Sequence, residues 1–316
     1  MEMVQGTDFT AAERAAEGAR RSGLTGLRRA ATRPYLLLAP SFLFLLLFTY
    51  LPILRVARDS LYLQNLGDAA GRFVGLANYG RLVADDKFRT ALLNNLLYAG
   101  ATLPPTIILA IAFAVFLKRS TRVNAVIRAC LFFPAVVPLT AAAGLWIFIF
   151  LPNGGLIDYY LGRFGVRGIN WLGNPDLALG ALSLLTVWKN AGYYMLFYIA
   201  GLQAIPEEAL EAATLDGATS WQRFRYVTLP LLKPTTAFVA VIALINVVTN
   251  VDHVIVMTHG GPNNATNLLL YYIFQTQTEF HDPGKATAAT VVSLACLLAI
   301  SLFGLRTLER GIRDGR

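Results

Sequence analysis

Charged residues are scarce in this chain of 316 residues, since Asp, Glu, Lys and Arg together make up only 15% of it, against about 25% in a soluble domain. Hydrophobic residues make up 55%. A soluble fold of this size could not cover so much apolar surface with so few polar residues. A disordered chain would be poor in apolar residues and rich in charge. The composition excludes both classes and predicts an integral membrane protein.

Cysteine and histidine are nearly absent, with two cysteines and three histidines in the whole chain. Cys130 and Cys296 lie inside apolar runs and form no Cys-x-x-Cys pair, so neither a disulfide framework nor a zinc site is expected. The sequence contains no GxxxxGK[ST] motif, which excludes ATP binding by a P-loop, and no nucleophile–base constellation. We therefore predict no catalytic residue, no metal ligand and no cofactor in this chain, and a protein that is not an enzyme on its own.

Six long apolar runs are present, each long enough or nearly so for the roughly 20 residues that cross a bilayer core as a helix. They extend over Tyr35–Leu54, Thr90–Leu117, Ala129–Leu151, Leu177–Ala204, Pro234–Val251 and Ala286–Leu305. The fifth is expected to continue to Thr258. We predict an all-α fold with six transmembrane helices over residues 35–310, between an N-terminal tail of residues 1–34 and a C-terminal tail of residues 311–316.

Basic residues are unevenly distributed among the segments that connect these runs. With the N-terminus inside, 17 Lys and Arg residues fall in inside segments and 9 in outside segments, although segment 55–90 alone holds six. Because basic loops stay on the cytoplasmic side, both termini are predicted in the cytoplasm. The net charge of +8 then reflects this bias and contact with membrane lipid, and binding to nucleic acid is not expected. The tail of residues 1–34 either lies on the inner leaflet as a helix or remains solvated.

One polar segment, residues 205–234, lies between the fourth and fifth runs. Two glutamates after a proline suit the first turn of a short helix, because acidic groups favour its positive end. Gly217 suits the position just past the helix, and Thr219 or Ser220 can cap a second short helix. Leu229-Pro230 is expected to end that helix. The segment is too polar to cross the membrane, so we predict a helical hairpin on the cytoplasmic surface.

The same segment resembles a known family. Glu211-Ala212-Ala213, three residues, Gly217, nine residues, Val227, one residue and Leu229-Pro230 match the EAA motif of ABC importer permeases, EAA-x3-G-x9-I-x-LP, with Val in place of Ile. In that family this loop is the coupling helix that docks on the ATP-hydrolysing subunit. The resemblance implies that role for Glu211, Ala212, Ala213, Asp216, Gly217, Leu229 and Pro230. An ordinary surface hairpin is the alternative.

A second stretch narrows the group. Asp252 and Thr258-His259-Gly260-Gly261-Pro262 resemble the D-x5-T-x-GGP stretch of carbohydrate-type permeases of the maltose and glycerol-phosphate group, and most closely the first permease of a heterodimeric pair. A plain turn would also explain Gly-Gly-Pro. The resemblance implies a bacterial or archaeal plasma membrane importer with a second permease, two ATPase subunits that bind ATP and Mg, and an extracytoplasmic solute-binding protein.

Polar residues inside the apolar runs are the candidates for the solute pathway, because polar groups are costly at membrane depth. Asn246 and Asn250 are four residues apart and His253 follows three later, so on one continuous helix the three would share a face. Amides and aromatic rings suit the hydroxyls and apolar faces of a sugar or sugar-like solute. The candidates are Lys189, Asn190, Tyr193, Asn246, Asn250, Asp252 and His253.

Alternatives stay open for these residues. The two asparagines can instead join helices through hydrogen bonds. Lys189 can pair with an internal carboxylate or carbonyl, or it can attract an anionic solute such as glycerol phosphate or a phosphorylated or sulfonated sugar. For the whole chain, an ion-gradient-driven secondary transporter is the alternative from another class, although the sequence shows no internal repeat or ionisable relay of the kind typical of such proteins.

Overall fold

The computed structural model describes residues 37–63 and 71–313, with side chains over 37–63, 71–299, 301 and 302. The chain divides into two compact units, residues 1–58 and residues 59–316, and each is described by itself. The predicted N-terminal tail lies outside the described residues. The division into a tail, a six-span domain and a second tail therefore stays a prediction.

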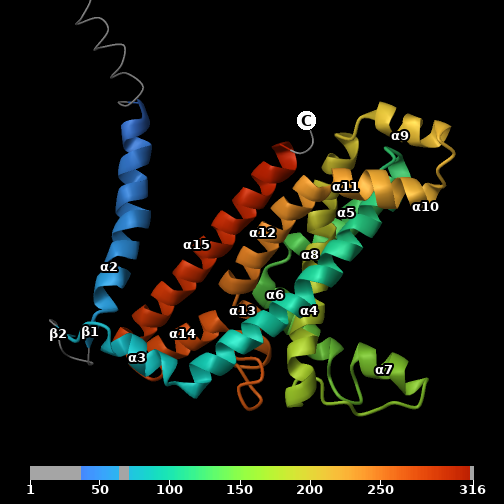
Figure 1. Ribbon diagram of the computed structural model, residues 1–316. Coiled ribbons are helices and arrows are strands. Elements are labelled where there is room, and N and C mark those ends of the chain that lie inside the picture. The colour runs from blue at the N-terminus through green and yellow to red at the C-terminus, as the bar shows by residue number, and fades with distance from the viewer. Residues whose placement is uncertain (1–36, 64–70, 314–316) are drawn as a thin grey trace, which may run out of the picture. The chain divides into compact units, whose positions relative to one another are not determined.

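The first unit is described from residue 37, and its described residues all belong to a helix of 23 residues, Leu37–Asp59, whose last residue is the first of the second unit. It includes the π-helical stretch η1, Leu46–Tyr50, and α2, Leu51–Asp59 (Figure 1). The wide turn of η1 ends two residues before Pro52, whose ring would crowd the carbonyl four residues earlier in a regular helix. This helix agrees with the first predicted run, apart from the two residues at its start that lie outside the described residues.

The second unit is mostly helical, and its elements follow one another with short connections. They are β1 Tyr62–Leu63, β2 Arg72–Phe73, α3 Ala77–Val83, α4 Asp86–Leu117, α5 Arg122–Val136, α6 Leu139–Ile149, α7 Leu156–Gly162, α8 Pro175–Gln203, α9 Glu207–Leu215, α10 Ser220–Arg223, η2 Phe224–Thr228, α11 Leu229–Leu231, α12 Lys233–Thr249, α13 Asp252–Met257, α14 Leu269–Thr278 and α15 Pro283–Arg313. The two short strands pair antiparallel, with Tyr62 opposite Phe73.

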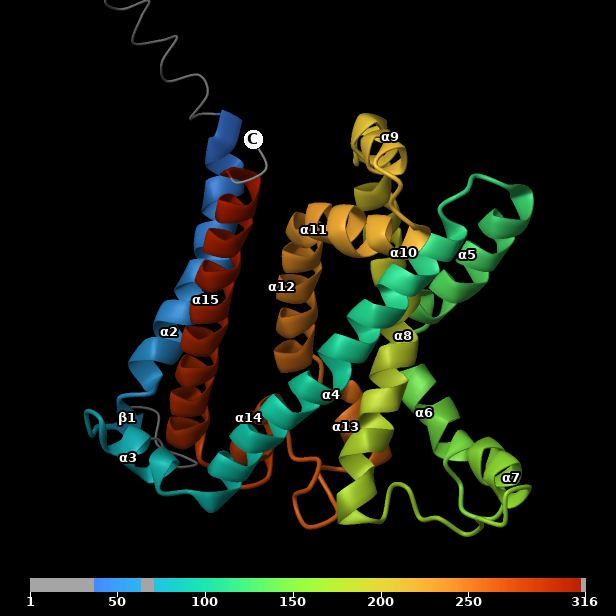
Figure 2. The same ribbon diagram turned by 45° about the vertical axis from the view of Figure 1, so that its right-hand side comes forward.

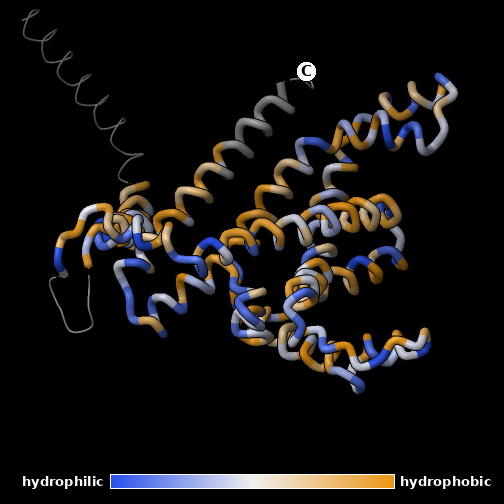
Figure 3. The backbone as a smooth tube through the Cα atoms, turned by 60° about the horizontal axis from the view of Figure 1, so that its bottom comes forward, coloured by the Kyte–Doolittle hydropathy of each residue, from blue (hydrophilic) through white to orange (hydrophobic). Residues whose placement is uncertain are grey.

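The two ends of the second unit differ in content. Figures 1 and 2 show α9, α10 and the C-terminal end of α15 at one end of the long helices, and α3, α7 and α14 at the other. Hydrophobic residues predominate along the long helices, and hydrophilic residues gather in the connecting loops (Figure 3). The hairpin and the end of α15 thus lie on the same side, as the predicted orientation requires.

Two helices are long and apolar enough to cross a membrane among the described residues: the helix over 37–59 and α4. Two bent pairs of helices, α5 with α6 and Ser220–Leu231 with α12, would each add one span if the pair crosses as a unit. The helix α8 has 29 residues and matches the fourth predicted run, and the sixth run lies within α15. The structure supports a helical membrane fold, and the count of six spans stays a prediction.

Two of the predicted runs are wrong as continuous helices. Within the third, α5 and α6 meet at an angle of 100°, because Val137 is extended and Pro138 cannot continue the ladder of N–H donors. The fifth does not continue to Thr258 as one helix. It ends at Thr249, since Asn250 has an extended backbone, and α13 begins afterwards as a separate helix.

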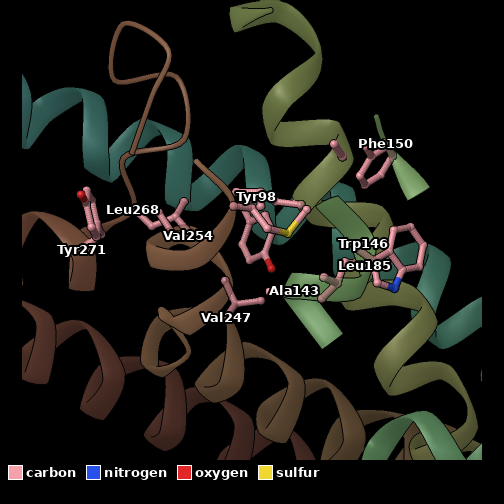
Figure 4. Packing of buried hydrophobic residues seen from close by; sticks show 12 residues of the cluster. Tyr98, Ala143, Trp146, Phe150, Leu185, Val247, Val254, Leu268 and Tyr271 are labelled. Carbon is pink, nitrogen blue, oxygen red and sulfur yellow. The ribbon is translucent and has the colours of Figure 1, made fainter. Parts of the chain in front are cut away.

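A buried hydrophobic cluster joins the middle of the second unit. Its members come from α4, α6, α8, α12, α13 and the start of α14, and Figure 4 shows twelve of them as sticks. The labelled residues are Tyr98, Ala143, Trp146, Phe150, Leu185, Val247, Val254, Leu268 and Tyr271. Because both α6 and α13 contribute to this cluster and pack against each other, this packing holds the two helix breaks in place.

Candidate functional site

The hairpin helix α9 ends in a tight, fully hydrogen-bonded turn. Gly217 has a φ of +78°, which glycine adopts without the crowding that a Cβ would cause. The Gly217 amide donates to the Thr214 carbonyl at 3.1 Å, and the Ala218 amide donates to the Ala213 carbonyl at 3.0 Å. This pair of bonds is the Schellman arrangement that ends many helices, and it confirms the turn predicted at Gly217.

The second helix of the hairpin starts at a capping box. Thr219 accepts from the Gln222 amide, and the Gln222 side chain accepts from the Thr219 amide at 2.7 Å, so the cap is the first of the two predicted candidates. Arg223 then connects the two arms, donating to the hydroxyls of Thr214 at 2.6 Å and Ser220 at 3.2 Å. Sequence reasoning missed Arg223, because its partner lies nine residues earlier in the chain.

The helix that starts at Ser220 runs through η2 and α11 and ends at Leu231, one residue after Pro230, where the chain bends by 62° into α12. This agrees with the end expected at Leu229-Pro230. The π-helical turn of η2 ends two residues before Pro230 and leaves room for its ring, as η1 does for Pro52. Leu229 and Pro230 are half-buried and lie at the base of the hairpin.

The face of the hairpin that carries the motif is accessible. Glu211, Ala212, Asp216 and Gly217 are exposed, while Ala213 is half-buried. An open hollow of about 480 Å³ lies between the arms. It is lined by Glu207, Leu210, Glu211, Thr214, Leu215 and Arg223. Sequence reasoning missed Leu215, an 88% exposed leucine that lines this hollow.

A small cavity lies among α4, α8, α12 and α13. Its volume is about 40 Å³, and since one water needs roughly 10–15 Å³ in this measure, it has room for a few waters and not for a sugar. Five of the predicted pathway residues line it, namely Lys189, Asn190, Asn246, Asn250 and His253. Tyr193 and Asp252 do not. Tyr193 instead packs against Phe197 in an edge-to-face pair, and Asp252 is exposed at the start of α13.

The helix break changes how the asparagines and the histidine meet. Asn246 lies on α12, Asn250 ends that helix with an extended backbone, and His253 lies on α13. The prediction that all three share the face of one helix is therefore wrong, but the break still turns all three toward the cavity. The Asn246 amide donates to the Tyr194 hydroxyl at 3.0 Å, which is the interhelical bond that the packing alternative requires.

Further polar residues of the cavity escaped the sequence analysis. Tyr98, Thr102 and Thr106 are four residues apart on α4 and line the cavity with Thr186 and Tyr194 of α8. The Tyr98 hydroxyl contacts His253 Nε2 at 2.9 Å and also bonds the Thr186 hydroxyl. Polar residues at every fourth position of an apolar run share a helix face, so this pattern was available in the sequence.

Among the residues that the structure describes, the hydrogen-bond partners of Lys189 are backbone carbonyls and not carboxylates. Its Nζ donates to the carbonyls of Pro134 at 3.0 Å and Ala135 at 3.4 Å, and also to that of Val137. These acceptors belong to the end of α5. The sequence analysis left open an internal carboxylate, a carbonyl or an anionic solute as the partner of Lys189. In the structure, carbonyls contact its ammonium group.

A second polar cluster joins α4, α14 and α15 at the end opposite the hairpin. Asp85 caps α4 by accepting from the Lys87 amide at 2.9 Å, and it also accepts from Lys285 Nζ at 2.7 Å and the Tyr272 hydroxyl at 2.9 Å. Burial raises the pKa of the Asp85 carboxyl, but these three hydrogen bonds outweigh it and the net pKa lies below the ordinary value. Arg81 of α3 adds an ion pair with Asp282.

Comparison with known sequences identifies similar proteins along most of the chain. The profile of the family described as "Binding-protein-dependent transport system inner membrane component" matches residues 87–314. The sn-glycerol-3-phosphate transport system permease protein of Agrobacterium fabrum is 31% identical over 89% of this chain and 96% of its own. The trehalose/maltose transport system permease protein of Thermococcus litoralis is 31% identical over 88% and 94%. The sulfoquinovosyl glycerol transport system permease protein of Agrobacterium fabrum is 32% identical over 86% and 90%.

Solved structures share the fold. A chain from the crystal structure of a bacterial ABC transporter involved in the import of the acidic polysaccharide alginate superposes with a TM-score of 0.77 at 23% identity, covering 90% of this chain and 98% of that one. A chain from the alginate transporter in complex with an alginate pentasaccharide-bound periplasmic protein gives the same TM-score at 22% identity, covering 90% and 96%. At this identity the likeness concerns the fold alone.

Proposed function

Because the chain belongs to the family of binding-protein-dependent transport system inner membrane components, we propose that it moves a sugar or sugar-like solute into the cytoplasm as the permease subunit of an ABC importer. The resemblance found at Glu211–Pro230 is thereby confirmed. The chain is a multi-pass inner membrane component and is not itself an enzyme. The solute, the partners and the orientation are proposed on the grounds given below.

The hairpin carries the coupling proposal. It presents Glu211 at the edge of an open hollow, beside an exposed leucine. The Schellman turn and the contacts of Arg223 close the hairpin, so its surface is ordered before any partner arrives. A carboxylate next to an apolar side chain on a rigid protrusion suits docking on an ATPase subunit that holds ATP and Mg. Two such subunits and a second permease would complete the transporter.

The solute proposal rests on the polar cavity. Amide, hydroxyl and aromatic groups line it at membrane depth, and such groups bind the hydroxyls of sugars and polyols. The cavity is too small for a sugar in this conformation, so transport requires the helices around it to separate, as alternating access demands. The three relatives are named for the transport of sn-glycerol 3-phosphate, of trehalose and maltose, and of sulfoquinovosyl glycerol. These names support a sugar or sugar-like solute. An extracytoplasmic binding protein would deliver the solute.

The proposed topology has six spans and both termini in the cytoplasm. The basic-residue bias supports it, and so does the placement of the C-terminal end of α15 on the side of the hairpin (Figure 1). An ATPase can reach the hairpin only from the cytoplasm. The coupling proposal therefore requires the proposed orientation, and a hairpin on the outside would refute both.

Glu211→Ala tests the coupling proposal, with Glu208→Ala as its matched control. Both glutamates are exposed on α9, but only Glu211 lines the hollow. Losing one charge-assisted hydrogen bond at the docking surface should lower affinity for the ATPase about tenfold. We expect Glu211→Ala to reduce co-purification of the ATPase and ATP-driven uptake into vesicles together, while Glu208→Ala changes neither. Equal behaviour of the two variants would refute the docking role of Glu211, and uptake without ATP would favour a secondary transporter.

A further inference from the structure

Lys189 lies at the centre of its helix and at the wall of the polar cavity. It is the fifteenth of the 29 residues of α8, a depth at which a charged group needs compensation. The three carbonyls that it contacts, of Pro134, Ala135 and Val137, precede it by 52 to 55 residues. An ammonium has three N–H donors, so these acceptors occupy its full capacity.

The carbonyls at the end of α5 need an outside donor. The last four carbonyls of any helix lack partners within it. In α5 the deficit cannot be met from the next turn, because the carbonyl of Pro134 would accept from residue 138, and Pro138 has no N–H. The positive charge of Lys189 also lies at the negative end of the α5 dipole, where a cation is stabilising. Lys189 therefore acts as a helix cap supplied by a neighbouring helix.

Gly192 brings α8 close enough for this contact. A Cβ on Gly192 would lie 1.8 Å from the carbonyl oxygen of Leu131 in α5, so only glycine permits this approach of the two backbones. Gly192 follows Lys189 by three residues, so both residues lie on the same face of α8. Gly192 contacts the side of α5, and Lys189 contacts its C-terminal end.

The bend that follows sets the wall of the cavity. After Val137 the chain turns by 100° into α6, and Leu139 at the start of α6 lines the cavity. Trp146 of α6 packs against Trp188 of α8 with their ring centroids 5.5 Å apart. The position of α6 against α8 therefore depends on the end of α5 staying where Lys189 caps it.

We propose that Lys189 is a positioning residue that caps α5 and fixes the α5–α6 bend, and that it is not a counter-ion for the solute. Since no other Lys or Arg and no Asp or Glu is among the described residues that line the cavity, the solute meets no free charge among them. The inference rests on the proposed function for the premise that the solute enters this cavity. The inference narrows the solute class to an uncharged sugar or polyol where the solute meets this cavity.

The first test needs no solute. In the purified transporter complex, the near-ultraviolet circular dichroism lost on Trp188→Phe defines the signal of the Trp146–Trp188 pair. We expect Lys189→Met to lose at least half of that signal and Lys189→Arg, which keeps a charged donor, to lose less. Ser183→Ala is the control, because the Ser183 hydroxyl bonds only the carbonyl of Leu179 in its own helix, and it should keep the signal. An unchanged signal in Lys189→Met would overturn the proposal.

The second test separates a cap from a counter-ion by kinetics. Uptake of maltose and of sn-glycerol 3-phosphate is measured in vesicles that contain the complete transporter. A cap predicts that Lys189→Met lowers the maximal rate and leaves KM within about twofold, and that maltose is the better substrate. A counter-ion predicts that KM for the phosphate ester rises tenfold or more with the tryptophan signal intact, which would refute the inference. If no ATPase subunit co-purifies with the unmodified permease, the proposed function is refuted; the first test can still be made on the purified permease, because it concerns only contacts within this chain.

Discussion

Replacing Gly217 should weaken coupling through the backbone alone. The φ of +78° at Gly217 costs an L-residue about 1–2 kcal/mol. An added Cβ would meet no atom within 4 Å, so crowding adds nothing to this cost. If the hairpin relieves the strain by opening, the equilibrium constant between its closed and open forms falls by a factor of about 5 to 30. The apparent Kd for the ATPase rises by up to that factor, because only the closed hairpin binds.

The assay is a binding titration of the purified ATPase subunit against the permease in nanodiscs. We expect a Kd increase of up to about 30-fold for Gly217→Ala and a larger one for Gly217→Val, whose branched side chain tolerates this conformation least. Gly217→Asn should change Kd less than Gly217→Ala, because asparagine is the residue that most readily replaces glycine at a helix end. Uptake should fall in the same order.

Two results would refute this reasoning. Equal Kd values for Gly217→Ala and Gly217→Asn would show that the positive φ does not set the cost. An equal increase in Kd for Gly180→Ala would show that the effect is not local to the hairpin. Gly180 lies within α8, also has open space around its Cβ position and has no positive φ.

Two further predictions concern the end opposite the hairpin and the orientation of the chain. The pKa of Asp85 is lower in the fold than its ordinary value near 4. The stability that the Asp85 carboxylate contributes is therefore complete above the ordinary value and is lost as the pH falls through the lowered pKa. Thermal unfolding measured from pH 6 downward should show this loss of stability, and Asp85→Asn should lack that part of the pH dependence. In a variant without Cys130 and Cys296, an impermeant maleimide added outside intact cells should label a cysteine at the exposed Phe164 position and miss one at the exposed Ser220 position. Labelling of the Ser220 position alone would show that the orientation is the reverse of the one proposed.

The hairpin is the part of the site that the sequence determined by itself. Its turn depends on a glycine at positive φ and on a threonine cap whose bonds span three residues. Such preferences act between neighbours in the chain, so a motif of fixed spacing contains them. The apolar runs are equally local, because a helix that crosses a bilayer satisfies its own backbone.

The cavity was decided by the tertiary structure. Sequence reasoning placed Asn246 and His253 on one helix, but the chain breaks between them, and packing of α13 against α6 holds the break. Tyr98 meets His253 across 155 residues of sequence. Lys189 finds its acceptors only where Pro138 leaves carbonyls without donors and Gly192 lets α5 approach. A buried polar group binds whichever partner the fold brings within about 3 Å, and no spacing within a single helix specifies that partner.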